Sequence, residues 1–141
     1  MGPLSLESLR SGARVLLDAP PIIYRLEGHP TLARRFDPIF NRHAEGDLRF
    51  AVTTIGLAEV LAGPLGAGDE VLASRYRKLL GQWDVVALDA DIAESAARLR
   101  ASLGLKLADA VQVASALAIG ADALVTHDRD FRRVKSIPIL S

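Results

Sequence analysis

The chain has 141 residues, of which 50% are hydrophobic and 24% are charged, with 17 basic and 17 acidic side chains and no cysteine. This size fits one domain with a buried core, and the composition excludes an intrinsically disordered chain. The lack of cysteine excludes disulfides, cysteine-based zinc sites and thiol catalysis, while the balanced charge neither favours nor excludes nucleic acid.

The first half of the chain alternates short apolar runs with helical patterns. These patterns predict a strand at 14–19, a helix at 21–27, a helical segment at 31–46, a strand at 48–54 and a short helix at 55–63. Pro38 is expected to interrupt the second helical segment, with Asp37 capping a restart. Gly63 and Pro64 are expected to close the short helix.

The second half repeats the alternation. It predicts a charged helix at 69–81, a strand at 84–89, a helix capped by Asp89 and running to Leu103, an apolar helix at 107–119, a strand within 121–128 and a short strand at 136–140. Strands that alternate with helices predict an α/β fold: a single-domain, three-layer sandwich with a mainly parallel central sheet of about five strands. We expect this domain to span residues 14–141, preceded by an N-terminal extension at 1–13.

Targeting signals are not apparent in the chain. No uncharged apolar stretch approaches the roughly 20 residues of a membrane helix, and the N-terminus lacks the basic start and apolar run of a secretory signal. We therefore expect a cytoplasmic protein without a membrane partner. Phosphate-binding glycine loops, the G-x-S-x-G elbow and the H-E-x-x-H zinc motif do not occur either.

Four acidic residues are predicted to lie near the carboxyl ends of the strands, which is where open parallel sheets bind their ligands. Asp18 ends the first strand and Asp128 ends the fourth. Glu59 lies in an otherwise uncharged helix after the second strand, and Asp109 lies in the first turn of the most apolar helix. Each has an ordinary structural explanation (a helix cap, a solvent-facing residue or a charge that complements a helix dipole), but together they predict a shared acidic site.

Carboxylates that lie together repel one another unless a cation neutralises them. With no cysteine and only three scattered histidines, an all-oxygen site favours Mg²⁺ or Mn²⁺. Such an ion holds phosphate oxygens and activates a water for in-line attack. Asp130, two residues after Asp128, is either a turn residue or a further ligand, so the expected metal ligands are Asp18, Asp109, Asp128 and Asp130.

Three segments of the sequence carry a family resemblance. They are VLLDAPPIIYRLEGHP, TTIGLAEVLAG and LADAVQVASALAIGADALVTHDRDF. Their order and content resemble the PIN-domain ribonucleases, especially VapC-type toxins, over about residues 14–140. The chain departs from the family pattern where Ala19 and Pro20 follow Asp18, and where His127 stands in a position at which Asn is common.

The resemblance implies a metal-dependent endoribonuclease that is the toxin of a type II toxin–antitoxin pair. Its catalytic acids would be Asp18, Glu59, Asp109 and Asp128, with Asp130 as an accessory and Thr126 orienting the carboxylates. It also implies an RNA substrate, a small antitoxin protein and a homodimer. The apolar side chains of the first helix would offer surface for one or both protein contacts: Ile22, Ile23, Tyr24 and Leu26.

A basic run follows the last acids, with Arg129, Arg132, Arg133 and Lys135 within seven residues. These side chains either form a solvated helix face or bind RNA phosphates. Two other functions remain open from the sequence. One is a phosphoryl-accepting receiver or phosphatase-like domain, which would require a second acid beside Asp18. The other is a non-enzymatic RNA- or protein-binding module that has retained the PIN-like fold.

Overall fold

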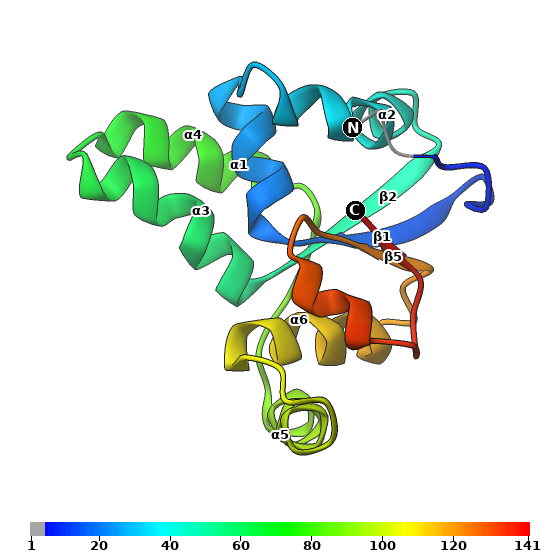
Figure 1. Cartoon of the computed structure of the whole chain (residues 1–141). Helices are drawn as coiled ribbons and strands as arrows, with labels where there is room; N and C mark the ends of the chain where they lie inside the picture. Colours follow the sequence, from blue (N-terminus) through cyan, green and yellow to red (C-terminus); the bar gives the residue numbers. More distant parts are fainter. Residues whose placement is uncertain (1–4) are drawn as a thin grey trace.

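The computed structural model describes residues 5–141, and its centre is a five-stranded sheet of order β3-β2-β1-β4-β5 in which every pairing is parallel (Figure 1). The strands are β1 (Ala13–Leu17), β2 (Leu48–Thr53), β3 (Asp84–Val86), β4 (Ala123–Val125) and β5 (Ile139–Leu140). The register sets Leu17 beside Val125, so the residues that follow β1 and β4 leave the sheet at the same edge.

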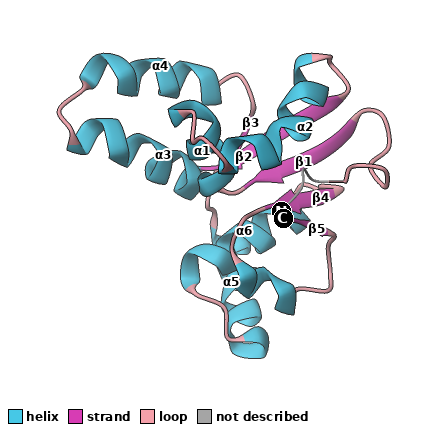
Figure 2. Ribbon diagram, turned by 45° about the horizontal axis from the view of Figure 1, so that its top comes forward, coloured by secondary structure: helices cyan, strands magenta, loops and turns pink. Residues whose placement is uncertain are grey.

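Helices cover both faces of the sheet (Figure 2). They are α1 (Ala19–Glu27), α2 (Leu32–Ala44), α3 (Thr54–Gly66), α4 (Glu70–Leu80), α5 (Ala90–Leu103), α6 (Leu107–Ala118) and the 3₁₀ helix η1 (Arg129–Arg133). Because side chains alternate along a strand, β1 serves two cores. Val15 and Leu17 pack with α1 to α4, whereas Leu16 packs with α5, α6 and η1. The predicted three-layer sandwich is confirmed.

Local capping explains several element boundaries. Asp89 accepts a hydrogen bond from the backbone N–H of Ile92 (2.9 Å), which confirms the predicted cap of α5. Gly28 ends α1 in the left-handed conformation, at φ 65°, which a side chain with a Cβ rarely adopts.

Two predicted helix interruptions were wrong. Pro38 lies inside α2, which runs unbroken because its neighbours Phe36 and Ile39 are fully buried in the core. This burial offsets the hydrogen bond that a proline removes. Asp37 does not cap a restart; its carboxylate pairs with Arg25 of α1 at 3.1 Å.

The helix after β2 also continues past its predicted end. Gly63 and Pro64 were expected to close it, but both lie within α3, which ends at Gly66. Pro64 is buried, so packing again outweighs the local preference for a break. Glu59 therefore lies in the middle of a longer helix than expected.

The segment before the sheet packs against α2. Residues 1–4 of the predicted extension lie outside the described residues, and Ala13 is already the first residue of β1. Leu9 is buried, and Arg42 donates hydrogen bonds to the carbonyls of Leu6 and Leu9. In the described part of the chain, no helix combines the length and apolar character that a bilayer crossing requires.

Candidate active site

Asp18 is buried at the carboxyl end of β1, with 6% of its surface exposed. It is the N-cap of α1, and its Oδ1 accepts hydrogen bonds from the backbone N–H of Ala19 (3.0 Å) and from Nε2 of Gln112 (2.9 Å). Its Oδ2 accepts one from the hydroxyl of Thr126 (2.9 Å). Three donors thus compensate for the burial of this carboxylate and hold it in one orientation.

Thr126 links Asp18 to the acids that follow β4. Its hydroxyl, fully buried, donates to Asp18 and accepts from the backbone N–H of Asp128 (3.0 Å). Asp128 in turn caps η1, because its Oδ1 accepts from the backbone N–H of Asp130 (2.9 Å). The hydrogen bonds that an orienting role for Thr126 would need are therefore present.

Three carboxylates meet at this edge. Asp109, in the first turn of α6, offers a carboxylate oxygen within 4.8 Å of one from Asp128 and one from Asp130. All three residues are half-buried, and they form the one group of potential metal-ligating side chains found among residues 5–141. We call Asp109, Asp128 and Asp130 the acid triad.

The charge at Asp109 is only partly compensated by a nearby cation. Burial, followed by the negative charges of Asp128 and Asp18, raises its pKa from 3.8 to about 6, although Lys106 acts in the opposite direction. Its Oδ2 is buried without a hydrogen-bond partner. A buried oxygen of this kind is costly unless something outside the chain satisfies it.

Asp18 and Glu59, both predicted site residues, lie outside the acid triad. Asp18 is close enough for its charge to raise the pKa of Asp109 and of Glu59. Glu59 lies on an exposed part of α3, and its pKa is raised by partial burial and then by Asp18. The structure thus brings Asp109, Asp128 and Asp130 together, with Asp18 beside them and Glu59 at the rim.

Polar residues that the sequence analysis did not select complete the site. Gln112 is 1% exposed and joins two elements: it donates to Asp18 and its Oε1 accepts from the hydroxyl of Thr53 (2.5 Å), which caps α3. Gln112 follows Asp109 by three residues in a helix whose only other polar residue is Ser115, so it shares a helix face with a predicted site residue. The three-residue spacing from Asp109 could therefore have identified Gln112 as a site residue from the sequence.

A contact between two side chains, which was not predicted from the sequence, connects α1 to the loop before η1. The hydroxyl of Tyr24 lies 2.9 Å from Nδ1 of His127. Their rings meet edge to face, with centroids 5.5 Å apart. Partial burial, and then the charge of Asp18, raises the pKa of Tyr24. The loop that carries Asp128 is therefore tied to the helix that Asp18 caps.

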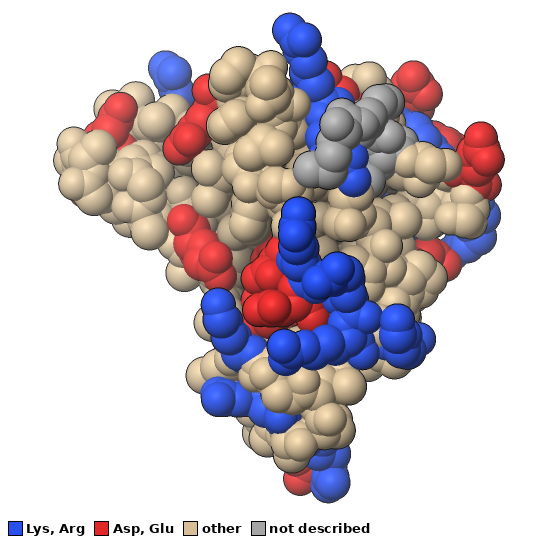
Figure 3. All heavy atoms as spheres, viewed as in Figure 1, with Lys and Arg blue, Asp and Glu red and all other residues tan. Residues whose placement is uncertain are grey.

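Basic side chains surround the acids, and Figure 3 shows one patch of carboxylates at the centre of this face with Lys and Arg on its flanks. Arg129 and Arg132 are exposed on η1. Arg133 is exposed too, but its guanidinium donates to the carbonyls of Leu103 and Gly104 (3.3 Å each) at the end of α5. Of the three arginines predicted to bind RNA, Arg133 is thus engaged within the fold.

The core takes up part of the apolar surface that was expected on the first helix. Ile22 is 1% exposed, and Ile23, Tyr24 and Leu26 are half-buried because they pack against the core. The amphipathic helix turns these side chains inward. A depression of about 340 Å³ nevertheless opens between α1, α2 and α4, with Leu26, Phe40, Leu79 and Trp83 among its lining residues.

The chain is an α/β protein with a cluster of carboxylates at the carboxyl edge of its parallel sheet. Comparison with known proteins identifies its family. Residues 15–137 match the model of the PIN domain, so the chain belongs to the PIN domain family. No curated protein matches the chain.

Solved structures share the fold. A toxin–antitoxin complex from Klebsiella pneumoniae is 25% identical, with a TM-score of 0.69 over 90% of this chain and 96% of that one. VapBC2 from Rickettsia felis, bound to a DNA fragment from its promoter, is 19% identical, with a TM-score of 0.71 over 89% and 96%. The sarcin–ricin loop-cleaving toxin VapC20 from Mycobacterium tuberculosis is 15% identical, with a TM-score of 0.65 over 84% and 92%.

Proposed function

We propose that this PIN-domain protein is a metal-dependent endoribonuclease and the toxin component of a type II toxin–antitoxin system. The observation that carries the proposal is the acid triad, whose oxygens lie within 4.8 Å of one another while Oδ2 of Asp109 is buried and unpartnered. A repulsive arrangement of this kind is maintained at a cost to stability, which a bound cation would offset.

The residues fit a hard divalent cation. The donors are carboxylate oxygens, with neither thiolate nor imidazole in the triad, which favours Mg²⁺ or Mn²⁺. Asp109, Asp128 and Asp130 would hold the ion, with Asp18 completing the set. When bound, such an ion neutralises phosphate oxygens and activates water for in-line displacement.

Residues around the acid triad would have separate roles in orientation, proton transfer and RNA binding. Asp18, oriented by Thr126 and Gln112, adds negative charge beside the triad without moving. Glu59, at the rim of the site with its pKa raised by partial burial and then by Asp18, would position or deprotonate the attacking water. Arg129 and Arg132 would bind RNA phosphates, and Arg133 would contribute less because carbonyl groups already occupy it.

Partners follow from the same proposal. The similar fold of the toxin–antitoxin complexes supports a cognate antitoxin. We place its apolar contact in the depression between α1, α2 and α4, where Leu79 remains 38% exposed. We also propose a homodimer, and a cytoplasmic location because the substrate is RNA.

The test is an RNA cleavage assay with Mg²⁺, Mn²⁺ or EDTA, followed by chemical mapping of the cut ends. Attack by water requires no RNA 2′-hydroxyl as nucleophile, so the products should carry 5′-phosphate and 3′-hydroxyl ends. Asp109→Asn should lower the rate about a hundredfold or more. Cyclic-phosphate ends, or full activity in EDTA, would contradict the mechanism, and RNA binding without cleavage would favour a non-enzymatic module.

A further inference from the structure

A pocket of about 310 Å³ has Asp128 in its lining. The other lining residues are Arg35 of α2, Arg129 and Arg132 of η1, His127, Ile139 of β5 and Ser141. We call it the arginine pocket. Three arginines and one aspartate line it, so its excess of positive charge favours an anion.

The arginines are presented by an anchored segment. Phe131 is fully buried and Val134 is 4% exposed, which anchors η1 against the core and leaves Arg129 and Arg132 at the surface. Nε of Arg132 donates to the carbonyl of Arg129 (3.2 Å), and Arg35 donates a hydrogen bond to the carbonyl of Ser141. Side chains that are restrained in this way lose less entropy on binding than freely rotating ones do.

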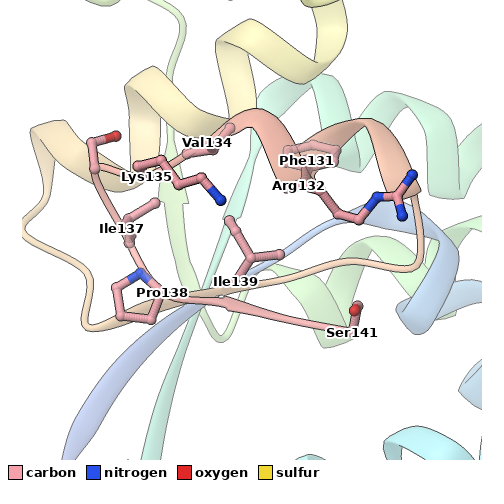
Figure 4. A pocket seen from close by; sticks show the side chains of 9 residues that line it. Phe131, Arg132, Val134, Lys135, Ile137, Pro138, Ile139 and Ser141 are labelled. Atoms are coloured by element: carbon pink, nitrogen blue, oxygen red, sulfur yellow. The ribbon is translucent and has the colours of Figure 1, made fainter.

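The pocket opens into a second depression. This one has a volume of about 580 Å³, lies between η1 and β5, and shares Arg132, Ile139 and Ser141 with the arginine pocket. Figure 4 shows Arg132, on η1, and Lys135, in the segment that follows η1, among the residues that line this depression. A basic path therefore runs from Asp128 along η1, which is the arrangement that a polyanionic strand requires.

His127 also lines the pocket. Its Nδ1 lies 2.9 Å from the hydroxyl of Tyr24, and its ring is held edge to face by Tyr24 and by Phe36, with centroids 5.5 and 5.9 Å away. These contacts fix the orientation of the imidazole. Because Tyr24 occupies Nδ1, the Nε2 edge is the one left for a ligand in the pocket.

We propose that the arginine pocket is a phosphate subsite that receives the RNA phosphodiester next to the one cleaved, with the imidazole of His127, positioned by Tyr24, as a further contact. The inference rests on the proposed function for its substrate. RNA is favoured over an acidic peptide because the pocket shares Asp128 with the acid triad, so a phosphate held there continues the strand whose neighbouring phosphate lies at the acids.

The experiment measures binding of a fluorescent single-stranded RNA to the full-length protein in EDTA, where cleavage does not interfere. Arg129→Gln should weaken binding about tenfold and reduce the salt slope by about 0.7. Tyr24→Phe changes no charge and keeps the ring contacts, yet it should weaken binding about three- to tenfold, because His127 loses the hydrogen-bond partner that orients its ring. Arg98→Gln, an exposed arginine of α5 paired with Glu94, is the matched control and should bind as the wild type does.

Nitrogen NMR of His127 supplies a second measurement. Inorganic phosphate should shift the Nε2 resonance of His127 in the wild type and in Arg98→Gln but much less in Arg129→Gln. In Tyr24→Phe the shift should be smaller than in the wild type, because the ring is no longer held by the Tyr24 hydroxyl. Circular dichroism of each variant separates these effects from misfolding.

Three results would overturn the subsite: wild-type RNA affinity in Tyr24→Phe, equal losses in Arg98→Gln and Arg129→Gln, or tighter binding of an acidic peptide than of RNA at the same variants. Failure of the nuclease proposal is distinguishable. In that case the wild type would not cut RNA in Mn²⁺, while the variant-dependent binding in EDTA would persist.

Discussion

Replacing Asp109 with Asn should make the metal-free protein more stable and the metal-bound protein less so. In the wild type, the Asp109 carboxylate is partly buried beside Asp128 and Asp18, which raises its pKa from 3.8 to about 6. A carboxyl group with a raised pKa destabilises the folded state wherever it is ionised. Asn keeps the shape of the side chain and removes that charge.

The size of the effect follows from the shift. About two pKa units at roughly 1.36 kcal/mol each set a ceiling near 3 kcal/mol. Because Asp109 is only half-buried, solvent screening reduces this to about 1–2 kcal/mol. For a chain of this length, each kcal/mol corresponds to about 3–4 °C, so the melting temperature in EDTA should rise by about 3–8 °C.

Thermal unfolding with EDTA and with Mn²⁺ measures both halves of the prediction. An ion at one hundred times its dissociation constant stabilises the wild type by about 2.7 kcal/mol, and Asp109→Asn should lose most of this. The order of melting temperatures should therefore reverse between the two conditions. Asp91→Asn is the matched control, because Asp91 is an exposed acid in the first turn of α5; it should lose a few tenths of a kcal/mol and keep the full response to Mn²⁺.

The pH dependence has a definite sign. The folded protein binds a proton at Asp109 more tightly than the unfolded chain does, so wild-type stability in EDTA falls as the pH rises from about 3.8 to about 6. The advantage of Asp109→Asn should be absent below that window and complete above it. A variant that melts below the wild type in EDTA at neutral pH, or an advantage that does not change with pH, would refute the reasoning.

Four further predictions concern metal binding, stability, RNA binding and the oligomeric state. Mn²⁺ affinity, measured by calorimetry, should fall as the pH drops below about 6, because a proton on Asp109 competes with the cation; a constant affinity from pH about 7 to about 5 would contradict this. Gln112→Leu should cost about 1–3 kcal/mol in chemical denaturation, because Asp18 and Thr53 both lose a buried partner, and it should also weaken Mn²⁺ binding, whereas an unchanged midpoint would show that the link is dispensable. Arg133→Ala should lower stability by about 0.5–1.5 kcal/mol and affect RNA binding less than Arg129→Ala does, as denaturation and anisotropy would measure. Light scattering should give a dimer of the 15.1 kDa chain, and a monomer across micromolar concentrations would count against the proposed assembly.

The sequence by itself determined the fold class and the positions of the acids. Alternating apolar runs and helical patterns indicated a parallel sheet, and the cap at Asp89 could be recognised because it depends on contacts within four residues. Asp18 and Asp128 could be assigned to one edge because carboxyl ends of parallel strands share an edge, and the pairing of Leu17 with Val125 confirms that placement.

Only the tertiary structure decided which acids meet and how each is held. Asp18 is held in place by hydrogen-bond donors as distant in sequence as Gln112 and Thr126, 94 and 108 residues away, whereas Asp109 has an oxygen left unpartnered. Packing also explains why α2 continues through Pro38, although a proline locally favours the end of a helix. Long-range hydrogen bonds and burial depend on how elements pack, and neither composition nor periodicity contains that information.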